Sequence, residues 1–129
     1  MILVDSSVWI DFFNGRATPA VERLRAYIET DDIAIGDLML CEVLQGFRTE
    51  ADAQRAERAL TALIVLDLVT PERAILAAEQ YRGLRRRGIT IRKTIDLLIG
   101  AYCVNTGTPL LQDDRDFQPM AKHLGLVLA

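Results

Sequence analysis

Five carboxylates occupy positions from which they can share a metal ion. Asp5 directly follows the short apolar run ILV, and Asp114 and Asp116 follow the run TPLLQ. Glu42 and Asp96 lie within the apolar segments LMLCEVL and TIDLLIGA, where helix packing would strip water from a carboxylate at a cost that something must offset. Carboxylates that crowd together also repel one another, and in isolation some of them stay protonated.

A divalent cation reverses both penalties. Mg²⁺ and Mn²⁺ prefer hard oxygen ligands, and Mg²⁺ keeps several of its waters when only a few carboxylates bind it. A bound metal lowers the pKa of a coordinated water, and two metals about 3.5–4 Å apart can hold both ends of an in-line phosphoryl displacement. The chemistry that these residues indicate is therefore hydrolysis of a phosphodiester.

Each acid also has an ordinary structural explanation when it is taken alone. Asp5 could cap the helix that follows it, and Glu42 could be a partly exposed helix acid. Asp96 could pair with Arg92 one helical turn earlier. The cluster DDRD at 113–116 could be a solvated loop, as most acidic loop clusters are. Only the joint placement of these residues favours the metal site.

Other reaction classes find less support. His123 is the only histidine, so a mechanism with two histidines is not available, and we interpret this residue as a surface or cap residue. The chain has no glycine-rich phosphate loop, no G-x-S-x-G elbow and no cysteine–histidine zinc pattern. Cys41 and Cys103 lie in apolar helical patterns, which favours buried reduced thiols over a disulfide or a zinc site. Asp11 fits the outer face of the first helix and is assigned a structural role.

The elements that must position the acids alternate between strands and helices. Apolar, β-branched runs predict strands at residues 2–5, 32–36, 65–69, 108–112 and 126–128. Periodic apolar spacing predicts helices at residues 6–13, 20–29, 38–47, 50–63, 71–88, 94–105 and 116–125. Asp37 is expected to cap the third helix, and Pro119 to interrupt the last. The alternation indicates a single α/β domain over residues 1–129, with three layers (α/β/α) and a mainly parallel sheet of about four to five strands.

A parallel sheet gives the acids a common location. Right-handed crossovers put the carboxyl ends of the strands on one edge, and ligands of such sheets bind beyond that edge. Asp5 lies at this end of the first strand, and Asp114 and Asp116 lie beyond this end of the 108–112 strand. If both strands belong to one sheet, geometry alone brings these acids together.

Four short segments resemble the motifs of a known family, in the family's order and with fitting spacings. The segments are VDSSVWIDFF, LMLCEVLQG, TIRKTIDLLIGA and LLQDDRDF. Together they make the chain, over nearly its whole length, similar to the PIN domain, specifically to the small VapC-type toxins of prokaryotic toxin–antitoxin pairs. The resemblance places the family's acids and a supporting hydroxyl at Asp5, Ser6, Glu42, Asp96, Asp114 and Asp116. One departure is visible, because the family often has threonine or serine where Gln112 stands, which bears on a hydrogen bond to the metal-site acids.

The resemblance implies a PIN-like fold and a Mg²⁺- or Mn²⁺-dependent endoribonuclease that cuts single-stranded or looped RNA and so stops translation. It also implies a VapB-like antitoxin whose C-terminal segment fills the active-site groove, and a toxin homodimer. We assign Asp5 and Asp96 as the principal metal ligands, with Asp114 and Asp116 completing the site. Glu42 either ligates a second metal or orients the attacking water, and the expected products carry a 5′-phosphate and a 3′-hydroxyl.

The charge pattern suggests where RNA would bind. The net charge of −3 argues against a broad, non-specific grip on nucleic acid, but residues 82–93 (RGLRRRGITIRK) carry six cations and no acid. We expect backbone phosphates to be held near the metal by Arg86, Arg87, Arg92 and Lys93. The structural alternative is a solvated helix end, stabilised by the helix dipole.

The same residues leave two alternative functions open, and the hydropathy pattern bears on the cellular location. The chain could be a PIN-type nuclease that acts on DNA or on maturing RNA, or a catalytically inactive module that binds a partner; the intact set of acids counts against the second. No apolar run approaches the length of a bilayer span, and the N-terminal run lacks a basic leader and a cleavage site. We therefore expect a cytoplasmic protein without membrane association.

Overall fold

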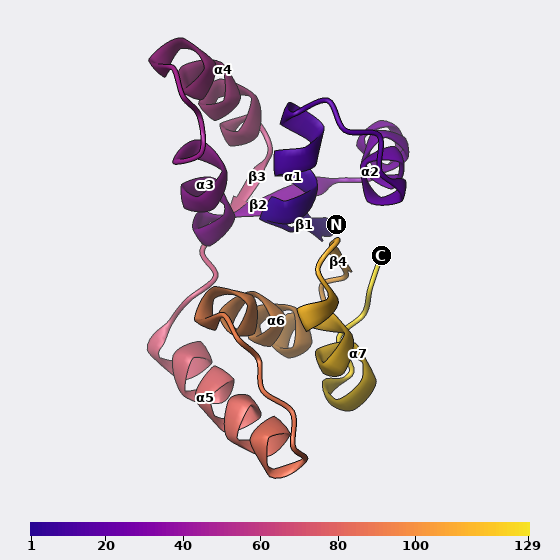
Figure 1. Ribbon diagram of the computed structural model, residues 1–129, viewed down its shortest axis with the longest axis vertical. Coiled ribbons are helices and arrows are strands. Elements are labelled where there is room, and N and C mark those ends of the chain that lie inside the picture. Colours follow the sequence, from indigo (N-terminus) through magenta and orange to yellow (C-terminus); the bar gives the residue numbers. More distant parts are fainter.

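The computed structural model describes residues 1–129, and strands alternate with helices along the chain (Figure 1). The strands are β1 (Ile2–Val4), β2 (Ile33–Gly36), β3 (Ile64–Leu66) and β4 (Leu110–Leu111). The α-helices are α1 (Ser6–Phe13), α2 (Pro19–Thr30), α3 (Asp37–Leu44), α4 (Glu50–Thr61), α5 (Pro71–Arg86), α6 (Thr94–Thr106) and α7 (Gln118–Leu124). A single turn of 3₁₀ helix, η1 (Arg115–Phe117), leads directly into α7.

The four strands form one parallel sheet in the order β3-β2-β1-β4, which confirms the predicted α/β class. Every residue of β1, β2 and β4 is buried. Because successive side chains of a strand point to opposite faces, both faces of the sheet must be covered, as the three-layer prediction requires. In Figure 1, α1 to α4 occupy the upper part of the molecule and α5 to α7 the lower part.

The pairing of β1 with the edge strand β4 brings the ends of two acidic motifs together. β1 pairs with β4 through Leu3 opposite Leu110 and Val4 opposite Leu111. Beyond the last pair, the backbone N–H of Asp5 donates to the carbonyl of Leu111 at 2.9 Å. The segment after β4 therefore leaves the sheet beside the start of α1, although 106 positions separate these two parts of the sequence.

Close packing between α6 and α7 sets the position of the second acidic segment. α6 is buried along most of its length, and a Cβ atom on Gly100 would lie 2.1 Å from the sulfur of Met120, which belongs to α7. The absence of a side chain on Gly100 therefore lets α7, and with it η1, pack directly against α6. α6 ends at Gly107, whose φ of 73° lies in the left-handed region that glycine adopts without steric cost.

Several element boundaries differ from the predictions. The third strand covers 64–66 rather than 65–69, because Leu68 turns away from the strand into the core, where it is fully buried. The predicted closing strand at 126–128 is wrong, since only an isolated bridge joins Leu128 to Leu110. Pro119 does not interrupt a helix but lies in the first turn of α7, where its missing N–H has no helical partner to lose.

Two side chains also depart from their predicted environments. Asp37 is the first residue of α3 rather than its cap, which is Gly36. The Asp37 carboxylate accepts hydrogen bonds from the backbone N–H groups of Leu38 (2.8 Å) and Leu68 (3.3 Å), and so ties α3 to the loop after β3. Cys103 is buried as predicted, whereas Cys41 is exposed, and both thiols are free. No helix combines the length and the hydropathy that crossing a membrane requires.

The contact between Gly36 and Leu68 predicts a stability effect. A Cβ atom at position 36 would lie 2.3 Å from Cδ1 of the fully buried Leu68, so Gly36→Ala must displace that side chain within the core. We expect the free energy of unfolding to fall by about 1–3 kcal/mol, measured by urea denaturation. Gly46→Ala is the matched control, because its Cβ would meet no atom closer than 3.5 Å. Equal stability of the two variants would contradict this packing.

Candidate metal centre

The five predicted acids lie on the elements that meet at the carboxyl edge of the sheet. Asp5 follows β1, Glu42 lies on α3, Asp96 lies in the first turn of α6, and Asp114 and Asp116 belong to the η1 turn after β4. The closest group is a trio, Asp96, Asp114 and Asp116, in which one carboxylate oxygen from each residue lies within 4.8 Å of the others. Asp5 and Glu42 are not members of this trio, but repulsion from their charges raises the pKa of Asp96.

Asp5 divides its two oxygens between two roles. Oδ2 accepts hydrogen bonds from the backbone N–H of Ser7 (3.2 Å) and from its hydroxyl (2.6 Å), so this oxygen caps α1. Oδ1 is buried and has no hydrogen-bond partner. Burial raises the pKa of Asp5, repulsion from Asp114 adds to the increase, and the hydrogen bonds from Ser7 oppose it. The capping explanation is therefore correct for one oxygen and leaves the other available to a cation.

Ser6 connects the first helix to Glu42. Its hydroxyl, on a residue that is 7% exposed, donates to Oε1 of Glu42 at 3.0 Å. Burial raises the pKa of Glu42, the hydrogen bond from Ser6 lowers it, and repulsion from Asp5 raises it further. The predicted supporting hydroxyl thus holds the Glu42 carboxylate in a defined direction beside Asp5.

Asp96 is a buried carboxylate whose pKa is raised far above its ordinary value. It is 5% exposed, and its Oδ2 has no hydrogen-bond partner. Burial, followed by repulsion from Asp5 and Asp114, raises the pKa of Asp96 to about 7, against an opposing attraction from Lys93. The structural alternative, a pair with Arg92, is wrong, because the Arg92 guanidinium contacts Asp116 instead.

Hydrogen bonds to the backbone shape the η1 turn. Oδ1 of Asp114 accepts from the N–H of Asp116 at 2.9 Å, and the N–H of Asp114 donates to Oε1 of Gln112 at 2.6 Å. Gln112, where the resembled family often has threonine or serine, therefore bonds the backbone of the turn and not a carboxylate. Oδ2 of Asp116 is buried without a partner.

Three carboxylate oxygens in this region are thus buried and unpaired: Asp5 Oδ1, Asp96 Oδ2 and Asp116 Oδ2. Such groups are rare in folded proteins because each loses its hydration without compensation. All three belong to acids that the sequence assigns as metal ligands. A hard divalent cation, which takes oxygen ligands and offsets clustered negative charge, fits this donor set.

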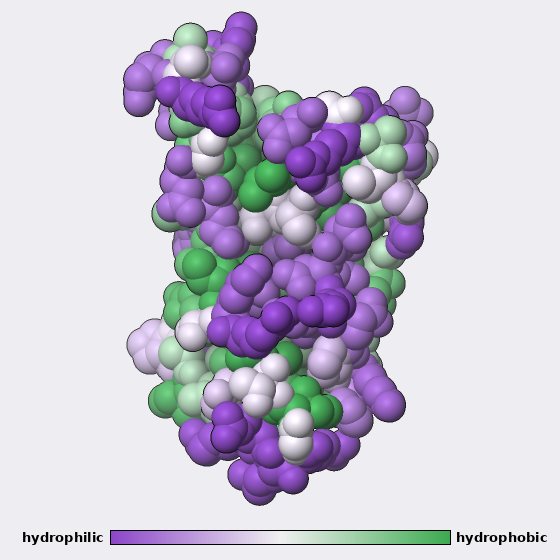
Figure 2. Space-filling model, in the orientation of Figure 1, coloured by the Kyte–Doolittle hydropathy of each residue, from purple (hydrophilic) through white to green (hydrophobic).

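Two of the four predicted phosphate contacts lie against the acids. The guanidinium of Arg92 lies 3.2 Å from Oδ1 of Asp116, and Nζ of Lys93 lies 3.6 Å from Oδ2 of Asp114. Attraction to Asp96, and then to Asp114, raises the pKa of Lys93. Both cations expose more than half of their side chains, so they neutralise the edge of the acidic group while remaining open to solvent. Figure 2 shows hydrophilic residues gathered across the middle of this face, over α6 and η1.

The other two predicted cations, Arg86 and Arg87, lie at the end of α5. The guanidinium of Arg87 lies 3.0 Å from Nδ1 of His123 on α7, a residue that the sequence left without a role. Sequence reasoning also missed Ser7, whose hydroxyl donates to Asp5 and accepts from the backbone N–H of Asp113 at 3.3 Å. Its place two residues after a strand-end acid is the pattern of a capping turn, which was the available signal.

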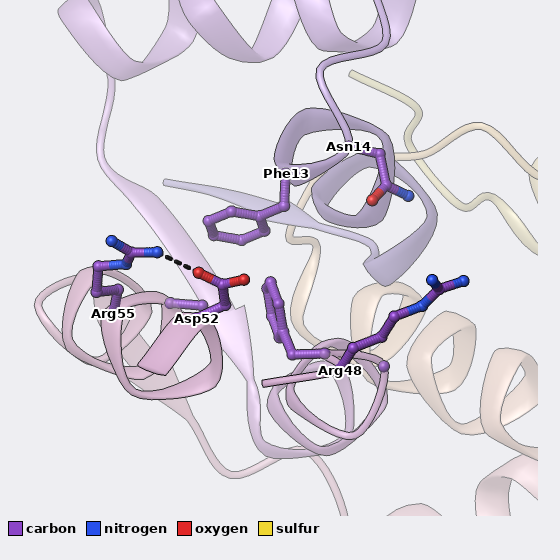
Figure 3. Close-up of a pocket in the computed structure, with 8 residues that line it drawn as sticks. Phe13, Asn14, Arg48, Asp52 and Arg55 are labelled. Carbon is purple, nitrogen blue, oxygen red and sulfur yellow. Dashed lines mark hydrogen bonds and ion pairs between the residues drawn. The ribbon is translucent and has the colours of Figure 1, made fainter. Parts of the chain in front are cut away.

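A separate hollow of about 620 Å³ lies away from the acids, between the end of α1, the α3–α4 turn and α4 (Figure 3). Phe13 and Phe47 both line it, and their rings pack edge to face with centroids 5.5 Å apart. Arg55 and Asp52 form an ion pair on its wall. None of the predicted metal ligands lines this hollow, so the carboxylate chemistry is confined to the sheet edge.

Comparisons with known proteins identify the family and the fold. The family model of the PIN domain matches residues 2–123. The chain is 30% identical over 131 aligned residues to a VapC ribonuclease of Mycobacterium bovis and to ribonuclease VapC11 of Mycobacterium tuberculosis. In each case the alignment covers 100% of this chain and 98% of the relative.

Solved structures with the same fold are more distant in sequence. VapBC2 from Rickettsia felis, bound to a DNA fragment from its promoter, has a TM-score of 0.78 at 19% identity, covering 100% of this chain and 98% of the other. FitAcB from Neisseria gonorrhoeae has a TM-score of 0.74 at 18% identity, with 99% and 96% covered. VapC20 of Mycobacterium tuberculosis, a sarcin–ricin loop cleaving toxin, has a TM-score of 0.69 at 18% identity, with 96% of each chain covered.

The raised carboxylate pKa values predict how metal-free stability depends on pH. The folded protein keeps a proton on Asp96 up to a pKa of about 7, whereas the unfolded chain releases it at the ordinary value for aspartate, near pH 4. The folded state therefore binds more protons in this window, and the free energy of unfolding should fall as the pH rises from 5 to 8. Urea denaturation in the presence of a chelator measures this slope.

Two variants isolate the source of the slope. Asp96→Asn should make the slope shallower, because the amide does not titrate, and the raised pKa values of Asp5 and Glu42 should account for the remainder. Asp11→Asn is the matched control, since Asp11 is an acid on α1 that pairs with Arg16 outside the acidic group, and it should keep the wild-type slope. The raised pKa of Asp96 would be contradicted if the wild-type protein became more stable from pH 5 to 8. It would also be contradicted if Asp96→Asn kept the wild-type slope.

Proposed function

The chain belongs to the PIN domain family, and from this premise we propose that it is a VapC-type toxin, an endoribonuclease that hydrolyses RNA phosphodiester bonds and so inhibits translation. Its full-length relatives are ribonucleases of this type. The observation that carries the proposal is the convergence of three buried, unpaired carboxylate oxygens at the carboxyl edge of a parallel sheet. A purely structural edge has no use for groups that repel one another in this way.

We propose that the site holds Mg²⁺, or Mn²⁺, between Asp96, Asp114 and Asp116, with Asp5 as the fourth acid. The trio gathers one oxygen from each of three acids within 4.8 Å of one another, and the free Oδ1 of Asp5 adds a further donor. The cation supplies a water of lowered pKa and positive charge for the phosphodiester. The closeness of the trio favours Asp96, Asp114 and Asp116 as the core of the set.

Glu42 is suited to handle the attacking water. Its carboxylate lies outside the trio, and its raised pKa brings it closer to the range in which a general base works near neutral pH. The hydrogen bond from Ser6 leaves one of its oxygens, Oε2, free to accept a proton. Lys93 and Arg92 are placed to exchange their carboxylate partners for substrate phosphates once a cation neutralises the acids.

Site substitution tests the nuclease directly. Purified protein, free of any partner, should cut total cellular RNA into discrete fragments with Mn²⁺ or Mg²⁺, and a chelator should stop the cutting. Asp96→Asn should lower the cleavage rate at least about 10²-fold, because it removes one charge from the ligand set. Asp11→Asn should cleave at the wild-type rate.

The outcome separates the alternatives. Cleavage that survives both the chelator and Asp96→Asn would point to a contaminating nuclease or a different site. A folded protein that binds Mn²⁺ but cuts DNA and not RNA would replace the substrate class. Absence of both cleavage and metal binding would leave a module that acts by docking a partner.

We also propose a VapB-like antitoxin as partner and a homodimer as the toxin's own assembly. The structures that share the fold include VapBC complexes. The edge strand β3 exposes Ile64 and Val65 at 41% and 43%, and an apolar edge strand with free backbone groups is a surface for self-association.

Light scattering tests the dimer. Purified toxin should show twice the 14.4 kDa mass of one chain, and Val65→Lys should reduce the mass toward that of one chain, because a buried ammonium group is costly. Thr61→Lys, at the exposed end of α4, is the matched control. A wild-type mass of one chain would contradict the proposal.

Co-expression of the antitoxin should suppress cleavage by the wild-type toxin.

A further inference from the structure

A positively charged hollow of about 640 Å³ begins at the edge of the acidic trio. Its basic lining residues are Arg92, Arg115, Lys122 and His123, which come from the loop before α6, from η1 and from α7. The one acid that lines it is Asp116, a member of the trio. The hollow therefore borders the trio through Asp116.

A second hollow of about 430 Å³ continues the first. It shares His123 with the first hollow and adds Arg86 and Arg87 from the end of α5, together with one acid, Glu79. The contact of 3.0 Å between Arg87 and Nδ1 of His123 lies at the junction. The two hollows together form a surface that we call the basic track, defined by Arg92, Arg115, Lys122, His123, Arg87 and Arg86.

The cations of the track are available to a ligand. Among its arginines and lysine, only Arg92 makes an ion pair with a carboxylate, and that carboxylate is Asp116. Arg86, Arg87 and Arg115 are exposed and have no acidic partner. In a chain whose net charge is −3, this concentration of unpaired positive charge fits an anion with several charges spread along its length.

The lining also indicates which part of a nucleic acid would make contact. No phenylalanine, tyrosine or tryptophan lines either hollow, and His123 is the one ring present, so the lining is dominated by cations rather than by stacking platforms. Arginine and lysine side chains in an open groove bind phosphates, which position a strand without reading its sequence. A polymer with one phosphate per nucleotide matches cations distributed over two adjoining hollows.

We propose that the basic track binds the sugar–phosphate backbone of the RNA strand on one side of the bond that is cut. This proposal rests on the proposed function, because the trio at the Asp116 end of the track is the place where the RNA strand would be cut. Arg115, Lys122 and His123 thereby become RNA-binding residues in addition to the four cations that the sequence suggests. Contacts of this kind leave base preference to other parts of the surface.

RNA binding in a chelating buffer, where no cleavage occurs, tests the track. The probe is a fluorescent single-stranded RNA of twelve uridines, and its affinity is measured by anisotropy between 50 and 200 mM salt. The double variant Arg115→Gln/Lys122→Gln should bind about 10-fold more weakly at low salt. Its slope of log affinity against log salt should be less steep by about 1.4, since each lost phosphate contact on a single strand contributes about 0.7.

The matched control is Arg48→Gln/Arg58→Gln, which removes the same charge from exposed positions on or just before α4, at the opposite end of the molecule in Figure 1. It should keep the wild-type affinity and slope. Equal weakening in both double variants, or none in the track variant, would overturn the proposal. Tighter binding of a twelve-residue poly-glutamate than of the RNA would overturn it in favour of a site for an acidic peptide.

Cleavage kinetics separate this proposal from the proposed function. With Mn²⁺, the track variant should raise KM for RNA about 10-fold and affect kcat much less. If the wild-type protein cleaves RNA and the track variant has an unchanged KM, the proposed RNA binding by the basic track is wrong and the proposed nuclease activity is retained. If the wild-type protein binds RNA through the basic track but never cleaves it, the proposed RNA binding is supported and the proposed nuclease activity is wrong. Thermal denaturation of each variant confirms that it folds.

Discussion

The organisation of this molecule depends on the cost of burying negative charge at one edge of its sheet. Asp5 and Asp96 are almost inaccessible, Asp116 is nearly so, and each keeps one oxygen without a partner. Burial and mutual repulsion push the pKa of Asp96 to about 7, so the metal-free site carries a proton that an ordinary aspartate would have lost. Such a site is poised to bind a divalent cation, because the cation removes the repulsion that the fold imposes.

The surrounding residues limit that cost without removing it. Ser7 satisfies one oxygen of Asp5, Ser6 satisfies one oxygen of Glu42, and Gln112 holds the backbone of the turn that carries Asp114. None of these bonds reaches the oxygens that remain free. The division suits the proposed metal site, because a fully satisfied carboxylate would have little affinity left for a metal, and a wholly unsatisfied one would not stay buried.

Positive charge is arranged around the acids at two distances. Arg92 and Lys93 touch the acidic group and offset part of its charge, whereas Arg115, Lys122 and the arginines at the end of α5 stand farther out along two adjoining hollows. The inner pair competes with a metal for the same carboxylates, and the outer set competes with nothing in the chain. A phosphate bound along the proposed track would approach the acids from the Asp116 side, although the net charge of the whole chain is −3.

The sequence by itself determined the class of fold, most of the helices and the five acids, because apolar periodicity, capping residues and strand-end carboxylates are local signals. It could not determine which oxygen of Asp5 caps a helix and which stays free, or that Arg92 pairs with Asp116 rather than with Asp96 one turn away. It also interpreted His123 as a surface or cap residue and assigned no role to Lys122. The packing of α7 against Gly100 of α6 places these two side chains in the hollow that Asp116 borders. Contacts between residues so far apart in the chain depend on how the helices dock on the sheet, and no local pattern encodes that docking.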